Sequence, residues 1–216
     1  MSLKRIAITG LGTINGAAKT LPAFQEAILQ GTSGIAPLDL FDVSQFSTQI
    51  GCQVKAYNPT DYFTRRQATH LSRTDQLALI AAREAVAMSG LTGVYDPYQV
   101  GVCIGGGVGG MLNAEEWLKG EMSGKPTRPG LLRTLMPDCS STALAKELGF
   151  AGYQGSITTA CSSSGTAIGW AADLIRTGRQ QAMLCGGADA LTMLTFAGFN
   201  ALKVVDPNPC APFSAG

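Results

Sequence analysis

The chain has 216 residues, 45% of them hydrophobic and only 14% charged, with a formal net charge of +1. That length suffices for one large domain, and the balanced charge, without a Lys/Arg cluster, argues against nucleic acid or an acidic membrane surface as a partner. About 25% charged residues is usual for a globular protein, so we expect several elements in buried central layers or part of the surface covered by a partner.

Other classes of protein are excluded by the pattern of the sequence. No uninterrupted apolar run reaches about 18 residues, which predicts no transmembrane helix. The first residues, 1–5, lack the long apolar stretch of a signal peptide, which predicts a cytoplasmic protein. The six cysteines form no CxxC or Cys/His pairing, so we expect no zinc site, disulfide framework or bound cofactor.

Segments typical of buried strands and of helices alternate along the chain. In chain order we predict a strand over residues 5–9, a helix over 21–29, an irregular surface excursion over 35–66, a helix over 71–88, a strand over 100–104, helices over 111–120 and 138–148, a strand over 156–159, a helix over 164–177 and a strand over 182–185. This alternation predicts a single α/β domain over residues 1–216, with a largely parallel, two-sided sheet.

The most informative segment joins a predicted strand to a predicted helix. It reads ITTACSSSG from residue 157 to residue 165, with Cys161 at the crossing. The positive end of a helix dipole and the unpaired first-turn amides favour an anion there, which makes a thiolate nucleophile accessible. The same amides can stabilise the oxyanion that forms when a thioester carbonyl is attacked. Cys161 is therefore a candidate for covalent acyl transfer, although a free cysteine can also be an ordinary buried residue.

Segments similar to one known family run in that family's order along almost the whole chain. They are ITGLG at 8–12, GTSGI at 31–35, RTDQLA at 73–78, IGGGVGG at 104–110, TACSS at 159–163, CGGAD at 185–189, Gly198-Phe199 and Pro212-Phe213. In these segments the chain resembles the N-terminal half of the beta-ketoacyl-acyl-carrier-protein synthases, which are thiolase-like condensing enzymes of fatty acid and polyketide biosynthesis.

The resemblance implies half of a thiolase-like fold, with a mixed, mostly parallel five-stranded sheet and helices on both faces. It implies that Cys161 accepts the acyl group and that its backbone amide forms part of the oxyanion hole. Val108 matches the residue at the end of the family's acyl channel and Phe199 a phenylalanine that gates it, so both are candidate substrate-binding residues, and either can equally be a packing residue.

The implied partners are an acyl carrier protein, with acyl and malonyl groups on its phosphopantetheine, and a second copy of the chain. In such a homodimer the strand before Cys161 would pair with its twin across a two-fold axis.

The second step of the family's reaction, decarboxylative condensation with the malonyl group, resembles a task for two histidines of its C-terminal half. The only histidine here is His70, just before the long predicted helix, where we expect a solvated or capping role. After Pro212-Phe213 the family commonly has aspartate, and here Ser214 takes that place. We therefore expect half of an enzyme, unable to condense alone, with an uncovered apolar side on the helix over 164–177.

Three other functions fit parts of the sequence. Gly105, Gly107 and Gly110 satisfy the dinucleotide pattern GxGxxG after a strand, but no acidic residue ends the next strand at the required spacing. The serines at 162–164 suggest a serine hydrolase, without GxSxG spacing or a plausible histidine. The third is a non-catalytic, thiolase-like partner subunit of a condensing complex, a class that generally loses the cysteine that this chain keeps.

Overall fold

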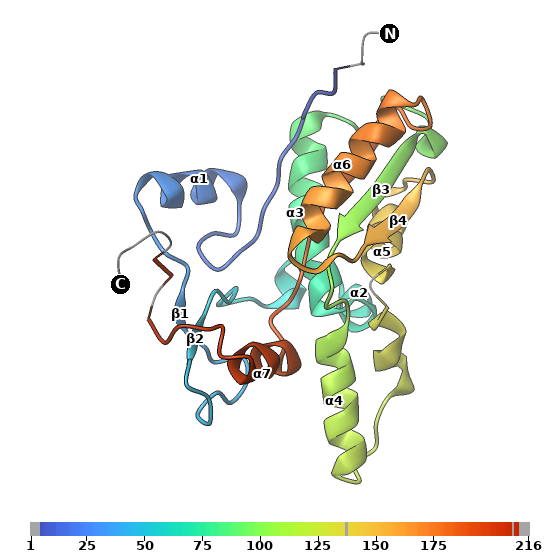
Figure 1. The fold of residues 1–216 in the computed structure, drawn as a ribbon. Coiled ribbons are helices and arrows are strands. Elements are labelled where there is room, and N and C mark those ends of the chain that lie inside the picture. Colours follow the sequence, from blue (N-terminus) through green and yellow to red (C-terminus); the bar gives the residue numbers. More distant parts are fainter. Residues whose placement is uncertain (1–4, 137, 209, 212–216) are drawn as a thin grey trace.

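A three-stranded parallel sheet lies at the centre of the computed structural model, which describes residues 5–136, 138–208 and 210–211 (Figure 1). The similar segment Pro212-Phe213 and Ser214 lie outside the described residues. β3 (Val100–Gly105) lies between β4 (Gln154–Ile157) and β5 (Ala182–Gly187). Every β3 residue is buried, as expected of a central strand covered on both faces. The predicted α/β class with a parallel sheet is confirmed.

Helices cover both faces of this sheet (Figure 1). α6 (Ser163–Arg176) lies on one face, and α3 (Arg73–Ser89) and α5 (Cys139–Leu148) lie on the other. The face toward α3 and α5 holds the main hydrophobic core, which contains Phe63, Ala78, Leu79, Ala82, Val102, Ile104, Leu144 and Ala145. Because side chains alternate along a strand, the buried Cys103 points away from this core and toward α6. Its register partner in β5 is Cys185.

The ends of α3 follow from its sequence. The Ser72 hydroxyl accepts a hydrogen bond from the Asp75 amide at 3.1 Å, and the Asp75 carboxylate accepts one from the Ser72 amide at 2.9 Å. This reciprocal capping box satisfies two amides that a helix start would otherwise leave unpaired. Gly90 ends the helix in the left-handed conformation, with φ 62°. The helix predicted over 71–88 is confirmed to within two residues.

The other elements surround the sheet. The remaining predicted helices are confirmed, two of them as α1 (Leu21–Leu29) and α4 (Met111–Met122). The excursion over 35–66 contains a short antiparallel ribbon of β1 (Ala36–Pro37) and β2 (Ile50–Gly51). Two helices are not predicted, α2 (Arg65–His70) and α7 (Met193–Ala201). Turns of 3-10 helix lie at Pro59–Asp61, Pro97–Gln99, Pro129–Thr134 and Ala160–Ser162.

The expected five-stranded sheet is wrong in its strand count. The described residues form a sheet of three strands and, apart from it, the two-stranded ribbon. The strand predicted over 5–9 does not form: the segment has no strand partner, and Ile8 is 78% exposed. Just after it the chain packs against α3, where a Cβ on Gly10 would lie only 2.1 Å from the Ala85 carbonyl oxygen. An apolar run becomes a strand only when a neighbouring strand pairs with its backbone.

Candidate active site

The carboxyl ends of the three parallel strands meet at one edge of the sheet, and the loops that follow them converge there. The loops are 106–110 after β3, 158–162 after β4 and 188–190 after β5. This edge is the usual place for a ligand site in an open α/β sheet. It holds a hollow of about 300 Å³, lined by Gly105, Gly106, Ala160, Cys161, Ser163, Ser164, Gly187, Ala188 and Asp189.

Cys161 lies exposed at this hollow, in the turn between β4 and α6. The preceding residue, Ala160, has φ +52°, a left-handed conformation that costs a non-glycine residue about 1–3 kcal/mol. The Ser163 hydroxyl braces the turn, because it donates to the Ala160 carbonyl at 2.7 Å and accepts from the Thr159 amide at 2.9 Å. The predicted strand-to-helix junction is confirmed, and local strain presents the thiol at its tip.

Among the described residues, the entry to α6 leaves the Cys161 amide unpaired, while the Ser162 and Ser163 amides donate to the Thr159 and Ala160 carbonyls. Ser162 is the N-cap residue, but its side chain makes no capping hydrogen bond. Within the part of the chain that the structure describes, no group accepts a hydrogen bond from the Cys161 amide. A helix start with unpaired amides attracts negative charge. The arrangement can therefore hold a thiolate or an oxyanion at Cys161.

Two glycines let α6 approach the strands closely beneath Cys161. A Cβ on Gly105 would lie 2.3 Å from the Ser163 carbonyl carbon, and one on Gly187 would lie 2.5 Å from the Ser164 Cβ. Real side chains do not tolerate such distances, so larger residues at either position would push the first turn of α6 outward.

Asp189 joins the loop after β5 to the glycine-rich loop after β3. Its carboxylate accepts a hydrogen bond from the Val108 amide at 2.8 Å and one from the Gly107 amide at 3.1 Å. A phosphate bound by this GxGxxG segment would have to displace a carboxylate that already occupies these amides. The structure therefore disfavours dinucleotide binding here.

The two pocket residues suggested by the resemblance lie outside the lining of the hollow. Val108 is half-buried in the glycine-rich loop, next to Gly107. Phe199 is on α7, with 52% of its surface exposed. Neither is among the residues that line the hollow around Cys161, so a substrate-binding role for each stays a prediction.

No histidine lies at the hollow. His70 is the last residue of α2, exposed, with its Nδ1 at 2.8 Å from the Arg66 carbonyl oxygen. The Ser162 and Ser163 hydroxyls both donate to backbone carbonyls within the turn that holds the cysteine. A serine hydrolase would need a histidine beside one of these hydroxyls, so the geometry favours Cys161 as the nucleophile.

The thiols beneath α6 differ from Cys161 in their surroundings. Burial raises the pKa of Cys103 from 9.0 to about 11, and the neighbouring Cys185 adds to the shift. Burial also raises the pKa of Cys185. Both thiols are therefore held in the protonated, unreactive form near neutral pH.

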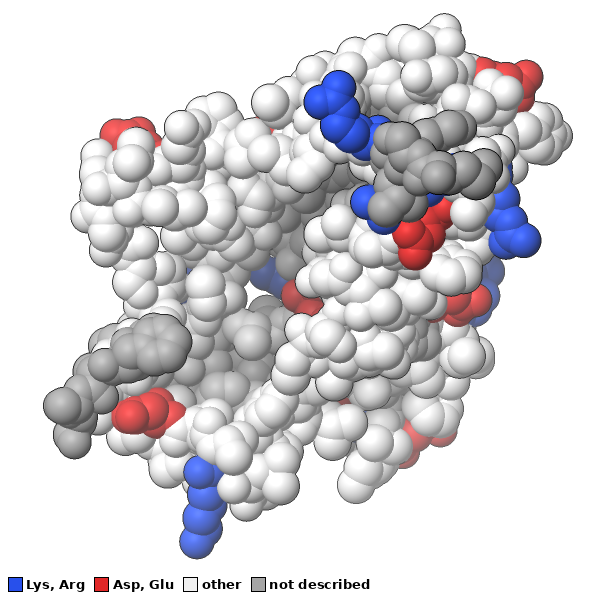
Figure 2. Space-filling model, turned by 45° about the horizontal axis from the view of Figure 1, so that its top comes forward, with Lys and Arg blue, Asp and Glu red and all other residues white. Residues whose placement is uncertain are grey.

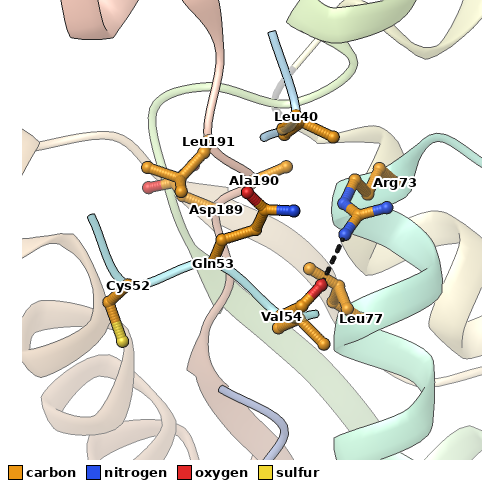
Figure 3. Close-up of a pocket in the computed structure, with 9 residues that line it drawn as sticks. All are labelled: Leu40, Cys52, Gln53, Val54, Arg73, Leu77, Asp189, Ala190 and Leu191. Atoms are coloured by element: carbon orange, nitrogen blue, oxygen red, sulfur yellow. Dashed lines mark hydrogen bonds between the residues drawn. The ribbon is translucent and has the colours of Figure 1, made fainter. Parts of the chain in front are cut away.

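A second, smaller cavity lies behind the loop after β5 (Figure 3). Its volume is about 40 Å³, enough for a water molecule or two but not for an acyl chain. Arg73 borders it and donates through Nη2 to the Val54 carbonyl at 3.0 Å, the bond drawn in Figure 3. The same guanidinium stacks over the Tyr57 ring at 4.8 Å. Through these two contacts Arg73 holds the segment over 35–66 against α3.

Residues 5–136, 138–208 and 210–211 contain neither a metal-binding cluster nor a membrane-spanning helix. That part of the chain contains no group of three His, Cys, Asp or Glu side chains arranged to bind a metal ion. None of its helices combines the length and the apolar character that a membrane crossing requires.

Comparison with known proteins identifies the family. Residues 3–216 match the family described as "Beta-ketoacyl synthase, N-terminal domain". The chain belongs to the beta-ketoacyl synthase family. It is 32% identical over 222 residues to 3-oxoacyl-(acyl-carrier-protein) synthase 2 of Staphylococcus aureus strain COL, a match that covers 99% of this chain and 54% of that protein. The protein of the same name from Synechocystis sp. is 31% identical over 206 residues, 94% of this chain and 50% of that one.

A solved beta-ketoacyl synthase structure is similar in fold. The ishigamide ketosynthase/chain length factor is 28% identical and superposes with a TM-score of 0.87, covering 96% of this chain and 53% of that chain. The expected thiolase-like half-fold is thereby confirmed. The chain spans about half the length of the curated relatives it matches.

Asp189 lies in the segment CGGAD, and the sequence alone indicates no role for its carboxylate. Its position was nevertheless a usable signal, because an acidic residue just beyond the carboxyl end of a predicted parallel strand lies where such sheets place functional groups. Its two amide partners are more than 80 residues away in the sequence, so its contacts were not predictable from spacing.

Proposed function

We propose that Cys161 accepts an acyl group from the thioester of an acyl carrier protein, the first step of a beta-ketoacyl-acyl-carrier-protein synthase. The Cys161 thiolate attacks the thioester carbonyl, a new carbon–sulfur bond forms, and the bond to the carrier's phosphopantetheine sulfur breaks. The departing thiolate takes up the proton that Cys161 gave up, so that charge and atoms balance. The exposed thiol at the strained turn, beside the hollow, is the observation that carries this proposal.

The Cys161 amide at the entry to α6, unpaired among the described residues, supports the chemistry of this step. The tetrahedral intermediate places a negative charge on the former carbonyl oxygen, next to the Cys161 sulfur. The Cys161 amide has no acceptor within the described residues, and the helix dipole adds positive potential there. Donors that are already in place stabilise such an oxyanion at no reorganisation cost.

Condensation with a malonyl group makes further demands. Loss of carbon dioxide leaves an enolate that needs hydrogen-bond donors, and the hollow contains no histidine to provide them. We propose that this step in the relatives' reaction requires groups beyond these 216 residues, so that the isolated chain loads an acyl group without condensing it. Condensation by the isolated chain, measured with malonyl carrier protein, would contradict this part of the proposal.

The proposed assembly is a homodimer paired through β4. β4 is an edge strand of the described sheet, with β3 as its strand neighbour there, and an edge strand can pair with a strand of another chain. Sedimentation at micromolar concentration tests this, and a monomer would rule the dimer out for the 216-residue chain.

A cytoplasmic location is also part of the proposal. The described cysteines are all free thiols, as is usual in a reducing compartment; they are Cys52, Cys103, Cys161, Cys185 and Cys210.

A loading experiment tests the central claim. The chain is mixed with an acyl carrier protein bearing a medium-length acyl thioester, and the product is digested and mapped by mass spectrometry. We expect the acyl mass on the peptide that contains Cys161, and none in Cys161→Ala. The matched control is Cys52→Ala, since Cys52 is also exposed but lies at the smaller cavity. Loading that survives in Cys161→Ala would refute Cys161 as the acceptor, and loading that is absent from the unaltered chain would favour the non-catalytic partner subunit.

A further inference from the structure

The glycine-rich loop after β3 borders the hollow through Gly106 and is loosely packed around Gly107. A Cβ on Gly107 would meet nothing within 4 Å, so the loop is not packed tightly around that position. Glycine backbones sample more conformations than other residues, which makes such a segment loose unless its polar groups are tied down. Hydrogen bonds from residues outside the loop therefore determine the position of the loop beside the hollow.

Three side chains make these hydrogen bonds. The Thr158 hydroxyl donates to the Gly106 carbonyl at 3.1 Å, from the segment that leads to Cys161. At the far end the Thr74 hydroxyl donates to the Gly109 carbonyl at 2.5 Å, from α3. Between them the Val108 carbonyl accepts a hydrogen bond from the Met111 amide at 3.1 Å, and the side-chain contacts are made to the loop's amides. Both the Gly107 and the Val108 amide donate to Asp189.

The Asp189 carboxylate has a favourable geometry for this task. Its Oδ1 accepts from two successive amides, at 2.8 Å and 3.1 Å, and its Oδ2 lies 3.3 Å from the Gly107 nitrogen. Two adjacent amides that point at one acceptor form a small anion-binding concavity in the backbone. Hydrogen bonds to a charged acceptor are stronger than those between neutral groups. Asp189 also lines the hollow, so the bonds lie at the wall that an acyl group would meet.

We propose that Asp189 is a positioning residue, which holds the glycine-rich loop as a wall of the hollow and thereby sets which acyl chains Cys161 accepts. The inference rests on the proposed acyl-loading function. Without the carboxylate the Gly107 and Val108 amides turn to solvent and the segment between Thr158 and Thr74 is free to shift. The wall then no longer discriminates between acyl chains of different length.

The test compares loading rates for two carrier thioesters, one with a six-carbon and one with a twelve-carbon acyl chain. In Asp189→Ala we expect the ratio of the two rates to change by about tenfold, the scale on which pocket shape distinguishes homologous chains. Asp189→Asn keeps an oxygen at the place of Oδ1, which accepts from both amides, and loses only the longer bond from the Gly107 amide to Oδ2, so it should restore the ratio to within about twofold of the original. The matched control is Asp173→Ala, because Asp173 pairs only with Arg176, on the far end of α6.

Two further measurements separate a wall effect from general damage. Iodoacetamide is a small reagent whose reaction does not depend on the shape of the hollow. Its rate of reaction with Cys161 in Asp189→Ala should therefore stay within about twofold of the rate in the unaltered chain. Amide hydrogen exchange in the peptide that spans 106–110 should accelerate by about tenfold, as expected when hydrogen bonds of a loop open locally. If Asp189→Ala fails to fold, Asp189→Glu is measured in its place. Its longer side chain must displace the loop, so the ratio of the two loading rates should change in this variant as well.

An unchanged ratio in a folded Asp189→Ala, or unchanged exchange over 106–110, would overturn the inference. Failure of the proposed function looks different, because the unaltered chain would then load neither thioester while Cys161 still reacts with iodoacetamide. In that case the specificity role falls with the function, and the exchange measurement still reports whether Asp189 holds the loop.

Discussion

α3 and α6 flank the same sheet, yet their N-termini are built in opposite ways. The start of α3 is closed: Ser72 and Asp75 satisfy each other's amides, and the Ser140 hydroxyl donates to the buried Asp75 carboxylate at 2.6 Å. The start of α6 leaves one amide unpaired: Ser162 provides no side-chain cap, and the Cys161 amide before it has no partner within the described residues. A helix that only supports the fold has its end groups satisfied, whereas one that serves chemistry leaves them for the substrate.

The two helices also differ in what they leave uncovered. α3 buries an unbroken run from Thr74 to Leu79. α6 buries one narrow stripe, Ser163, Ala167, Ala171 and Leu174, and exposes Ile168 and Trp170 on its outer side. Figure 2 shows one broad face of the molecule on which charged side chains are sparse, in keeping with the low charge of the chain. The uncovered side of α6 that the sequence predicted is therefore present.

The largest effect that we expect is the difference in reactivity between the Cys161 thiol, at the start of α6, and the Cys103 thiol, buried beneath the same helix. A thiol whose pKa is about 11 is roughly one part in a thousand thiolate at pH 8, and Cys103 is also fully buried on the sheet side of α6. The rise of the Cys103 pKa from 9.0 to about 11 lowers its thiolate fraction about a hundredfold, so we expect limited alkylation with iodoacetamide at pH 7 to 8 to label Cys161 at least about a hundredfold faster than Cys103. Peptide mapping measures the two rates.

The pH dependence of the same reaction has a definite sign. Because the pKa of Cys103 is raised, its alkylation should speed up by about tenfold per pH unit until pH approaches 11. The folded thiol stays protonated while the unfolded one ionises, so stability from this group is lost as pH rises from about 9 towards 11. Denatured protein is the control, in which both thiols react alike. Equal labelling of Cys103 and Cys161 in native protein would break the comparison.

The second largest effect is in stability. Leu79 of α3 is fully buried in the main core, so Leu79→Ala should lower the free energy of unfolding by about 2–5 kcal/mol. The matched change on α6 is Ile168→Ala, where the side chain is 49% exposed and the loss should stay below about 1 kcal/mol. Urea denaturation measures both. A loss at Ile168 as large as that at Leu79 would show that the outer side of α6 is covered in solution.

A smaller effect separates the two helix starts directly. Ser72→Ala removes the capping bond of α3 and should cost about 1 kcal/mol. Ser162→Ala removes no capping bond from α6, and its hydroxyl is exposed, so the loss should stay within about 0.5 kcal/mol. Urea midpoints at fixed pH compare the two variants. A larger loss for Ser162→Ala would mean that the start of α6 is capped after all.

The smallest effect is a gain. Gly165 lies in the first turns of α6, and a Cβ there would meet nothing within 4 Å. Gly165→Ala should therefore raise the free energy of unfolding by about 0.5–1 kcal/mol, because alanine loses less backbone entropy in a helix. Thermal unfolding checks this, with Gly105→Ala as the opposite case, since a Cβ at Gly105 clashes with α6. A destabilised Gly165→Ala would indicate that another surface packs against this side of the helix.

What the sequence predicted well was local. Gly90 marks the end of α3 because glycine, which lacks a Cβ, readily adopts the left-handed conformation found there. Cys161 was placed at a strand-to-helix junction by the residues on either side of it, and the structure agrees. α7 was missed because Met193–Ala201 is apolar without a clear helical period.

What the sequence could not supply was long-range pairing. The apolar run over 5–9 reads as a strand, but its conformation depends on a partner strand that the described residues do not provide. The bonds of Asp189 to Gly107 and Val108 depend on two strands coming side by side. The roles of Val108 and Phe199 were suggested only by resemblance, and neither residue reaches the hollow's lining.

The close approach of Gly105 and Gly187 to α6 has a consequence for how the nucleophile is aligned. The first turn of α6 rests directly on the backbone of β3 and β5, with no side chain between them to act as a cushion. The height of the Cys161 sulfur above the sheet is then set by backbone contact, which yields far less than side chains that can change rotamer. The backbone of the sheet therefore fixes the position of the first turn of α6, on which the alignment of the thiol depends.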